Sequence, residues 1–309
     1  MNPALFDALA IATALAVGFA LKHGGLCTYA AVLEIIEQRR IKRLAAFLGA
    51  AATTTWVVMP LSWWSSAPLT FSGSHFNWGT ILAGGALIAW GAWLNRGCFF
   101  GTFVQLVGGN FNYLATLVGV VAGLLTTRIF LDAWLPRLPE ASLATSAQPV
   151  GLFWLGAAFI FWLIVWWHST PKARLILLIL GIGGGWLYAA VAGWSLGAVL
   201  NGTVLHTLHL QPHPPSRLTL FASLAMVAGG LLAAWYGKSF QLRRPRLKAS
   251  AANLGGGALM GIGAALVPGG NDTLLLHGIP ALAPHAVVGY LAMLGGLWLL
   301  IRWASRGSP

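Results

Sequence analysis

The sequence predicts an all-α integral membrane protein, a single polytopic domain over residues 1–309. Three observations support this fold class: few charges, long apolar runs, and the placement of the basic residues. Of the 309 residues, 58% are hydrophobic and only 8% are charged, whereas a soluble protein carries about a quarter charged residues. Several apolar runs exceed the roughly 18 residues that suggest a membrane span. We therefore expect about nine transmembrane helices and four short re-entrant or loop helices.

Nine segments are long and apolar enough to cross the bilayer. They cover residues 4–21, 41–61, 78–95, 111–131, 150–167, 173–193, 216–236, 249–267 and 285–303. The first segment lacks a basic start and a small-residue cleavage site. We therefore expect it to be a retained span rather than a cleaved signal peptide.

Four further stretches are apolar but too short to span, at residues 26–37, 98–107, 194–208 and 271–279. Short apolar segments of this kind are often re-entrant or interfacial. Irregular backbone at membrane depth is tolerated only where it is buried in protein or lines a cavity. These stretches are therefore candidates for the walls of an internal pathway.

The basic residues favour one orientation of the nine spans. With the N-terminus outside and each short stretch returning to the side it left, 15 of the 18 Lys and Arg residues fall inside. Only Arg128, Arg137 and Arg217 fall outside. The positive-inside rule thus predicts a multi-pass protein of the plasma (inner) membrane with a cytoplasmic C-terminus. Topology also accounts for the formal net charge of +12, so we expect no nucleic-acid partner.

An internal repeat lies around the third and eighth spans. GGALIAWGAWLNRGCFFG (84–101) and GGALMGIGAALVPGGNDT (256–273) align without gaps at an offset of 172 residues. In the predicted topology the two copies run in opposite directions. We therefore predict an inverted repeat, with halves at about 1–135 and 173–303 joined by the span 150–167. Transporters often bind substrate at the interface of such repeats.

Three glycine-containing breaks between a long and a short segment carry the candidate site residues. They are HGGLC (23–27), NRGC (95–98) and VPGGND (267–272). The N-terminus of a helix after such a break offers free N–H groups and a partial positive charge, which together suit an anion. A thiol at the break can donate weakly to a polarizable sulfur anion or become a thiolate. The predicted pathway residues are Gly25, Cys27, Arg96, Gly97, Cys98, Gly269, Gly270, Asn271 and Asp272.

Each of these residues also has a purely structural interpretation. A lone cysteine among apolar residues is usually a small buried hydrophobe, and Arg96 could be a cytoplasmic anchor. Asn271 and Asp272 could cap the short helix that follows. An ionisable residue inside a membrane segment is, however, functional by default, so the sequence leaves both alternatives open.

No motif indicates a cofactor or a metal. His206, His209 and His213 lie close together, but no carboxylate or cysteine accompanies them, which favours a polar outer loop over a metal site. The chain has no Walker loop, dinucleotide fingerprint, HExxH or catalytic-triad pattern. We expect no cofactor, no metal and no enzymatic activity.

The glycine–cysteine breaks, their order and the nine-plus-four arrangement resemble the YeeE/YedE family of sulfur-compound transporters. The resemblance covers nearly the whole chain, from GGLCTYAAV (24–32) to the C-terminal repeat. It implies that Cys27 and Cys98 match two family cysteines and that thiosulfate passes along them by S–H hydrogen bonding. It also implies a soluble cytoplasmic sulfur-carrier protein as a partner.

The chain departs from this family at a third cysteine, which lies in a GGC motif near the C-terminus. The repeat alignment places Gly270 there, followed by Asp272, whose carboxylate would repel a dianion unless protonated or paired with a cation. We therefore predict membrane transport of a small sulfur-containing anion, either thiosulfate or a related species. The alternative is a membrane-bound, sulfurtransferase-like thiol enzyme with Cys98 as nucleophile and Lys22 or His23 as the nearest base.

Overall fold

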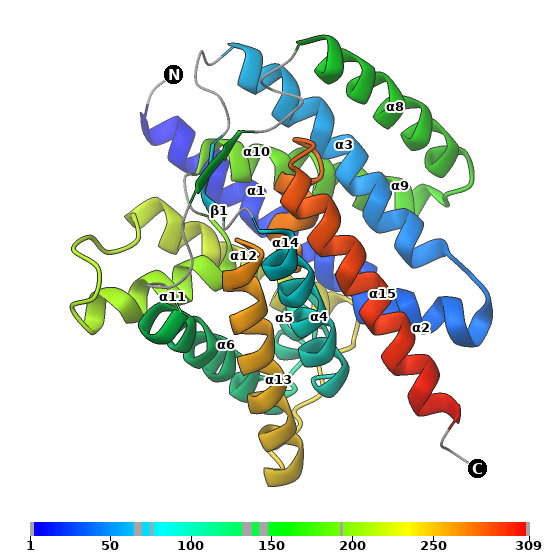
Figure 1. The fold of residues 1–309 in the computed structure, drawn as a ribbon. Coiled ribbons are helices and arrows are strands. Elements are labelled where there is room, and N and C mark those ends of the chain that lie inside the picture. The colour runs from blue at the N-terminus through cyan, green and yellow to red at the C-terminus, as the bar shows by residue number, and fades with distance from the viewer. Residues whose placement is uncertain are drawn as a thin grey trace.

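The computed structural model describes residues 3–64, 70–74, 77–131, 138–141, 148–191 and 194–306. Within these ranges the chain forms a bundle of long helices around several short ones (Figure 1). The long helices are α1 (Pro3–Gly24), α3 (Lys42–Trp64), α4 (Trp78–Leu94), α6 (Leu114–Thr126), α8 (Gln148–Trp167), α12 (Arg217–Tyr236), α13 (Leu247–Leu266) and α15 (Pro284–Arg306).

One further span is composite, and a second is extended at both ends. The sixth predicted span consists of α9 (Pro171–Leu178), the π-helical turn η3 (Ile179–Gly183) and α10 (Gly184–Ala190). The 3₁₀ turn η1 (Phe111–Tyr113) and the π-helical turn η2 (Thr127–Leu131) extend α6.

The predicted all-α membrane fold is confirmed. Eight helical stretches of the described residues are long and apolar enough to cross a membrane. The remaining predicted span coincides with α4, whose 17 residues lie at the lower limit of what crosses the hydrocarbon core. The start of α1 and the end of α15 lie at opposite ends of the bundle, as an odd number of crossings requires (Figure 1).

Short helices occupy all four stretches that were too short to span. They are α2 (Thr28–Gln38), α5 (Phe99–Leu106), α11 (Leu196–Thr207), and α14 (Asn271–Thr273) continued by the π-helical turn η4 (Leu274–Gly278). The order long, short, long, long, short, long therefore occurs twice, once before and once after α8.

A two-stranded antiparallel sheet, which the sequence did not predict, joins two connections assigned to the outer side. In it β1 (Thr70–Ser74) pairs with β2 (Leu138–Ala141).

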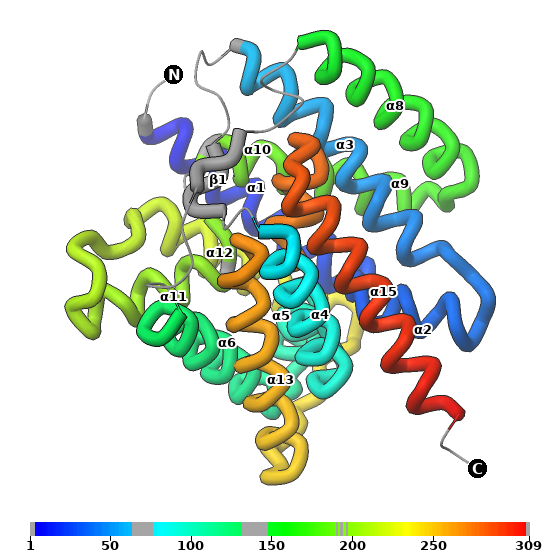
Figure 2. Tube along the Cα trace, viewed as in Figure 1, coloured from blue at the N-terminus to red at the C-terminus, as the bar shows by residue number. Residues whose placement is uncertain are grey.

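The joining helix α8 lies at the edge of the bundle beside α3 (Figures 1 and 2). Apolar side chains such as Phe153 and Ile160 are exposed along it. Because this helix is among the candidate spans, we assign that apolar face to lipid contact.

Glycines bring α4 and α13 into close contact at the centre of the bundle. A methyl group on Gly91 would overlap the carbonyl oxygen of Gly256, and a methyl group on Gly263 would overlap that of Gly84. Small residues allow backbones to approach in this way, which gives membrane helices their packing energy. Gly84 and Gly256 are counterparts at the repeat offset of 172 residues, and so are Gly91 and Gly263. The contacts join Gly91 to Gly256 and Gly84 to Gly263, so each glycine contacts the counterpart of the other glycine in its own helix. This is the contact pattern that a two-fold axis between α4 and α13 would produce.

Candidate functional site

The two cysteines lie side by side at the starts of two short helices. Cys27 immediately precedes α2, and Cys98 immediately precedes α5. Their sulfur atoms are 3.7 Å apart, although 71 residues separate them in the sequence. The backbone N–H of Thr28 donates to the Cys98 sulfur at 3.2 Å. The positively polarised end of α2 therefore points at a sulfur atom, a place where negative charge is stabilised.

Glycines make this approach sterically feasible. Gly25 adopts a left-handed conformation with φ of 58°, which turns the chain sharply after α1 at no Cβ cost. Gly101 lies in the first turn of α5, where an added Cβ would come within 2.5 Å of the Cys27 sulfur. A side chain at position 101 would therefore displace the Cys27 sulfur from its present place.

Asn271 joins the starts of three short helices. Its Oδ1 accepts from the backbone N–H of Phe99 at 3.1 Å, and its Nδ2 donates to the Thr28 hydroxyl at 3.3 Å. The side chain is fully buried. Phe99 directly follows Cys98 and Thr28 directly follows Cys27, so Asn271 of the third break hydrogen-bonds the residue next to each cysteine. Phe99 and Asn271 are themselves 172 residues apart, so counterparts in the repeat alignment contact each other.

The second half places other residues at the two cysteine positions. Gly270 precedes α14 in an extended conformation, as Cys98 precedes α5. Ser195 precedes α11 in an extended conformation, as Cys27 precedes α2. The Ser195 hydroxyl accepts from the N–H of Ala198 at 3.0 Å and so caps α11. Both thiols therefore lie before α8. The corresponding positions after α8 have the Ser195 hydroxyl and the backbone of Gly270, which has no side chain.

The Asp272 carboxylate occupies the space into which a side chain at position 270 would extend. An added Cβ on Gly270 would lie 2.5 Å from Asp272 Oδ1 and 3.2 Å from the Phe99 ring. The hydroxyl of Tyr188 in α10 donates to Asp272 Oδ2 at 3.2 Å. Asp272 thus has a fixed position beside the convergent helix ends rather than on the outside of the bundle.

A polar cavity of about 440 Å³ opens beside Asp272. Its walls come from α5, α6, α10, α11, α13 and the α14–η4 segment. Its lining includes Phe99, Tyr188, Trp194, Ser195, Asp272 and His277. Gly269 and Gly270 also border it, and Gly269 has a φ of 138°, a conformation essentially reserved for glycine.

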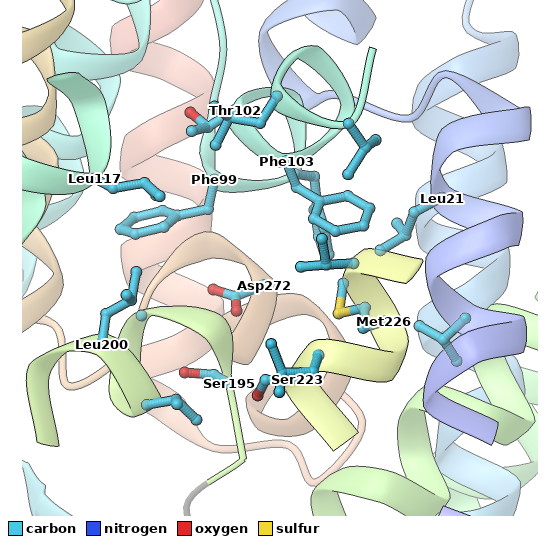
Figure 3. A pocket seen from close by; sticks show the side chains of 18 of the residues that line it. Leu21, Phe99, Thr102, Phe103, Leu117, Ser195, Leu200, Ser223, Met226 and Asp272 are labelled. Atoms are coloured by element: carbon cyan, nitrogen blue, oxygen red, sulfur yellow. The ribbon is translucent and has the colours of Figure 1, made fainter. Parts of the chain in front are cut away.

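A larger and almost entirely apolar cavity of about 680 Å³ adjoins the polar one. It lies between α1, α5, α6, α11 and α12. Figure 3 shows the Asp272 side chain between Phe99 and Ser195, facing this cavity. Asp272 lines both cavities and is therefore the charged group at their junction.

Neither cysteine is among the residues that line these two cavities. Cys98 is fully buried and Cys27 is 7% exposed. Phe99, which follows Cys98 directly, borders both cavities and packs against Gly270. The cysteines are thus in contact with each other but separated from the open space by about one residue, and a cysteine-lined pathway stays a prediction.

Comparison with known protein families decides the assignment of the chain. The sequence model of the sulphur-transport family matches residues 23–174 and matches again over residues 166–299. The chain belongs to the YeeE/YedE sulphur-transport family. A comparison with curated proteins gives no match. The two family matches together include all three breaks and all four short helices completely.

Arg96 lies on the exposed surface of the break that carries Cys98. In this member of the sulphur-transport family it is exposed, with a left-handed φ of 50°. It interacts electrostatically with Tyr29 and Tyr113. It does not line either of the two cavities. This placement is compatible with both sequence interpretations, an anchor at the cytoplasmic end or a charge near the inner mouth of a pathway.

Asn95 is a site residue that the sequence analysis missed. This buried residue ends α4 and accepts from the Thr116 hydroxyl at 2.7 Å. Its amide donates to the carbonyl of Gly97 at 2.7 Å and to Thr102 at 3.0 Å. These bonds fix the break that carries Cys98. A buried asparagine at the end of a membrane helix was the available signal, because such a group must be hydrogen-bonded.

The bases considered for a thiol enzyme have other partners. Lys22 donates from Nζ to the carbonyl of Val104 at 3.2 Å, and the His23 ring stacks on Phe19. Among the described residues, no group of three or more His, Cys, Asp or Glu side chains could hold a metal ion. Membership of a transport family agrees with the expectation of a transporter rather than an enzyme.

Proposed function

We propose that the protein carries a small sulfur-containing anion, thiosulfate or a related species, across the plasma membrane along Cys27 and Cys98. The observation that supports this most directly is the pair of sulfur atoms 3.7 Å apart, with a helix N-terminus donating to one of them. An anion with a polarizable sulfur atom could insert between the two thiols. It would then accept hydrogen bonds from a weak S–H donor and from the polarised N–H groups at the start of the helix.

The proposal places these cysteines at the interface of two inverted copies. The repeated order of helices, the double match of the family model and the reciprocal glycine contacts of α4 and α13 support it. The N-terminus would lie outside and the C-terminus inside, with Cys27 and Cys98 on the inner side of the interface. The pathway is closed near Phe99 in this arrangement, so transport would require this ring to move.

A cytoplasmic partner fits the same orientation. The exposed basic stretch 238–248 packs its backbone against the α5–α6 connection, where Gln241 N donates to Gly108 O at 2.9 Å and Arg243 N donates to Gly109 O at 2.8 Å. This connection follows the helix that begins at Cys98. A soluble sulfur-carrier protein with an acidic surface could therefore receive the anion close to the thiols.

The function is tested by uptake into vesicles reconstituted with purified protein, using labelled thiosulfate, sulfite and sulfide. We expect Cys98→Ala to lower uptake by about tenfold or more, because it removes the S–H donor and a hydrogen bond to a charged group is worth about 1.5–3 kcal/mol. Ser62→Ala, which removes a buried hydroxyl from α3 that bonds only within its own helix, is the matched control. Full uptake by Cys98→Ala would contradict the thiol pathway.

The enzyme alternative has a separate signature. A thiol enzyme would accumulate a mass-shifted adduct on Cys98 during turnover and would move no label across the vesicle wall. Net accumulation of label by the wild type, without such an adduct, would exclude this alternative.

A further inference from the structure

Two buried polar groups among the lining residues of the polar cavity, one donor and one acceptor, have no hydrogen-bond partner among the described atoms. Trp194 lines it and is only 4% exposed, yet its indole Nε1 has no hydrogen-bond partner among the described atoms. Asn201, also in the lining, has a buried amide oxygen without a partner in the same set. Because leaving a buried polar group unpaired costs about 1–3 kcal/mol, such groups beside an open space indicate a ligand.

The N-terminus of α11 adds a second source of positive potential. This helix has 12 residues and begins directly after Trp194 and Ser195. Ser195 satisfies only the N–H of Ala198, so the other N–H groups of the first turn have no partner within the helix. Gly197 in that turn borders the cavity without a side chain. Trp194 and the start of α11 therefore bring hydrogen-bond donors and no thiol to the cavity wall, and they are its candidate anion subsite.

The charge balance of this subsite is unusual for an anion. Asp272 is the only acidic residue in the lining, and the lining contains no Lys or Arg. The other titratable groups that face Asp272 are Tyr188 from α10, which donates to it, and His277 from η4, whose ring stacks on Tyr188. His285 of α15 interacts electrostatically with His277. The neighbouring segments α5 and α11 present Phe99 and Ser195 to the cavity, which are uncharged.

An anion next to an ionised Asp272 would meet a like charge, because the Tyr188 hydroxyl and the backbone N–H of Thr273 donate to the carboxylate without adding positive charge. No fixed cation of the lining offsets that charge, so a proton is the species that can remove it. The proton has a defined place, because Tyr188 bonds Oδ2 and leaves Oδ1 toward Gly270. That oxygen occupies the space of the missing third thiol.

We propose that the polar cavity binds the substrate anion only when Asp272 carries a proton, so that the protein transports an anion and a proton together. This inference rests on the proposed function. The cavity borders the end of α13, which is the outer end in the predicted topology. The Asp272 carboxylate takes one proton from the external solution and becomes a neutral acid. The anion then accepts from Trp194 Nε1 and the start of α11, and both species leave toward the cytoplasm, where Asp272 releases the proton.

The test measures uptake of labelled thiosulfate, sulfite and sulfide by reconstituted vesicles over a range of external pH. Above the pKa of a carboxyl, the protonated fraction falls about tenfold per pH unit. We expect wild-type uptake to rise with external acidity and to alkalinise the outside medium. Asp272→Asn keeps a neutral side chain of the same size, so its uptake should persist and lose the pH dependence. Glu34→Gln, at an acid paired with Arg43 outside both cavities, should keep the wild-type profile.

Trp194→Phe tests the anion subsite separately. This change keeps an aromatic ring and removes the unpartnered N–H, so we expect the half-saturation concentration to rise about tenfold with the pH profile unchanged. Trp56→Phe is the matched control, because Trp56 Nε1 is also buried and unpartnered but lies outside both cavities. Equal half-saturation constants for the two variants would overturn the subsite.

The failures of the two proposals can be told apart. Uptake by the wild type that is independent of pH, with Asp272→Asn identical to it, would overturn proton coupling and leave the transport function intact. Absence of uptake for every anion in the panel would contradict the proposed function. In that case, infrared difference spectra between acid and alkaline medium test the protonation of Asp272 without any measurement of uptake. A carboxyl C=O band present in the wild type and absent from Asp272→Asn supports it, and identical spectra overturn it.

Discussion

Asn271 shows how one residue can hold a site together in a membrane protein. Its amide bonds the N–H of Phe99 and the hydroxyl of Thr28, and these two residues follow the two cysteines directly. It has the alternative structural interpretation of a helix cap, but no side-chain cap bond is found at the start of α14. The amide instead serves the starts of the neighbouring helices. These two bonds fix the starts of the helices that follow Cys27 and Cys98.

Removing this amide should loosen both cysteine-bearing helix ends. We expect Asn271→Ala to lower the free energy of unfolding by about 1–3 kcal/mol, because two buried groups lose a partner. Thr28→Ala should also lower the free energy of unfolding, since it breaks the 3.3 Å bond to Asn271. Combined, the two changes should cost less than their sum, because they share that bond. Denaturant unfolding in detergent measures all three values, and strict additivity would show that the Asn271–Thr28 bond is not formed.

At the scale of elements, glycine decides how near the short helices come to each other. Gly101 in α5 faces the Cys27 sulfur, and an added Cβ there would overlap it. We expect Gly101→Ala to separate the thiols and to lower uptake. A mild oxidant should convert the wild-type thiols to a disulfide, and this reaction should be slower in the variant.

Gly156→Ala supplies the control for this prediction. Gly156 lies in the lipid-facing helix α8, and an added Cβ there would meet nothing within 4 Å. Its uptake and its rate of disulfide formation should match the wild type. If Gly101→Ala behaves in the same way as Gly156→Ala, the close contact of Cys27 with α5 is wrong.

The sequence could predict the features that depend on neighbouring residues, and it could not predict contacts between distant ones. Each span and each short helix agrees with its predicted range to within about four residues, because length and apolarity are local properties of the chain. The breaks at Gly25 and Gly269 were also predictable, since glycine there permits a positive φ. The contact of Cys27 with Cys98 and the reach of Asn271 to Thr28 span 71 and 243 residues. No periodicity encodes such contacts.

For the whole molecule, the membrane potential determines how much free energy a co-transported proton contributes to the entry of an anion. An inside-negative potential opposes entry of an anion by about 2.3 kcal/mol per charge for each 100 mV. Thiosulfate carries two negative charges, so one accompanying proton would halve this opposing term. A neutral substitute at position 272 removes the proton and leaves the full charge of the anion to be moved.

This difference predicts an electrical signature. In vesicles with an imposed inside-negative potential, steady-state accumulation of thiosulfate should fall with potential in both proteins. Its logarithm should fall about twice as steeply for Asp272→Asn as for the wild type, because two net charges rather than one cross per cycle. Potassium gradients with valinomycin set the potential, and labelled thiosulfate measures the accumulation. Among the described residues, Asp272 is the only acid that borders either cavity, so equal slopes would mean that the wild type moves the anion without a proton.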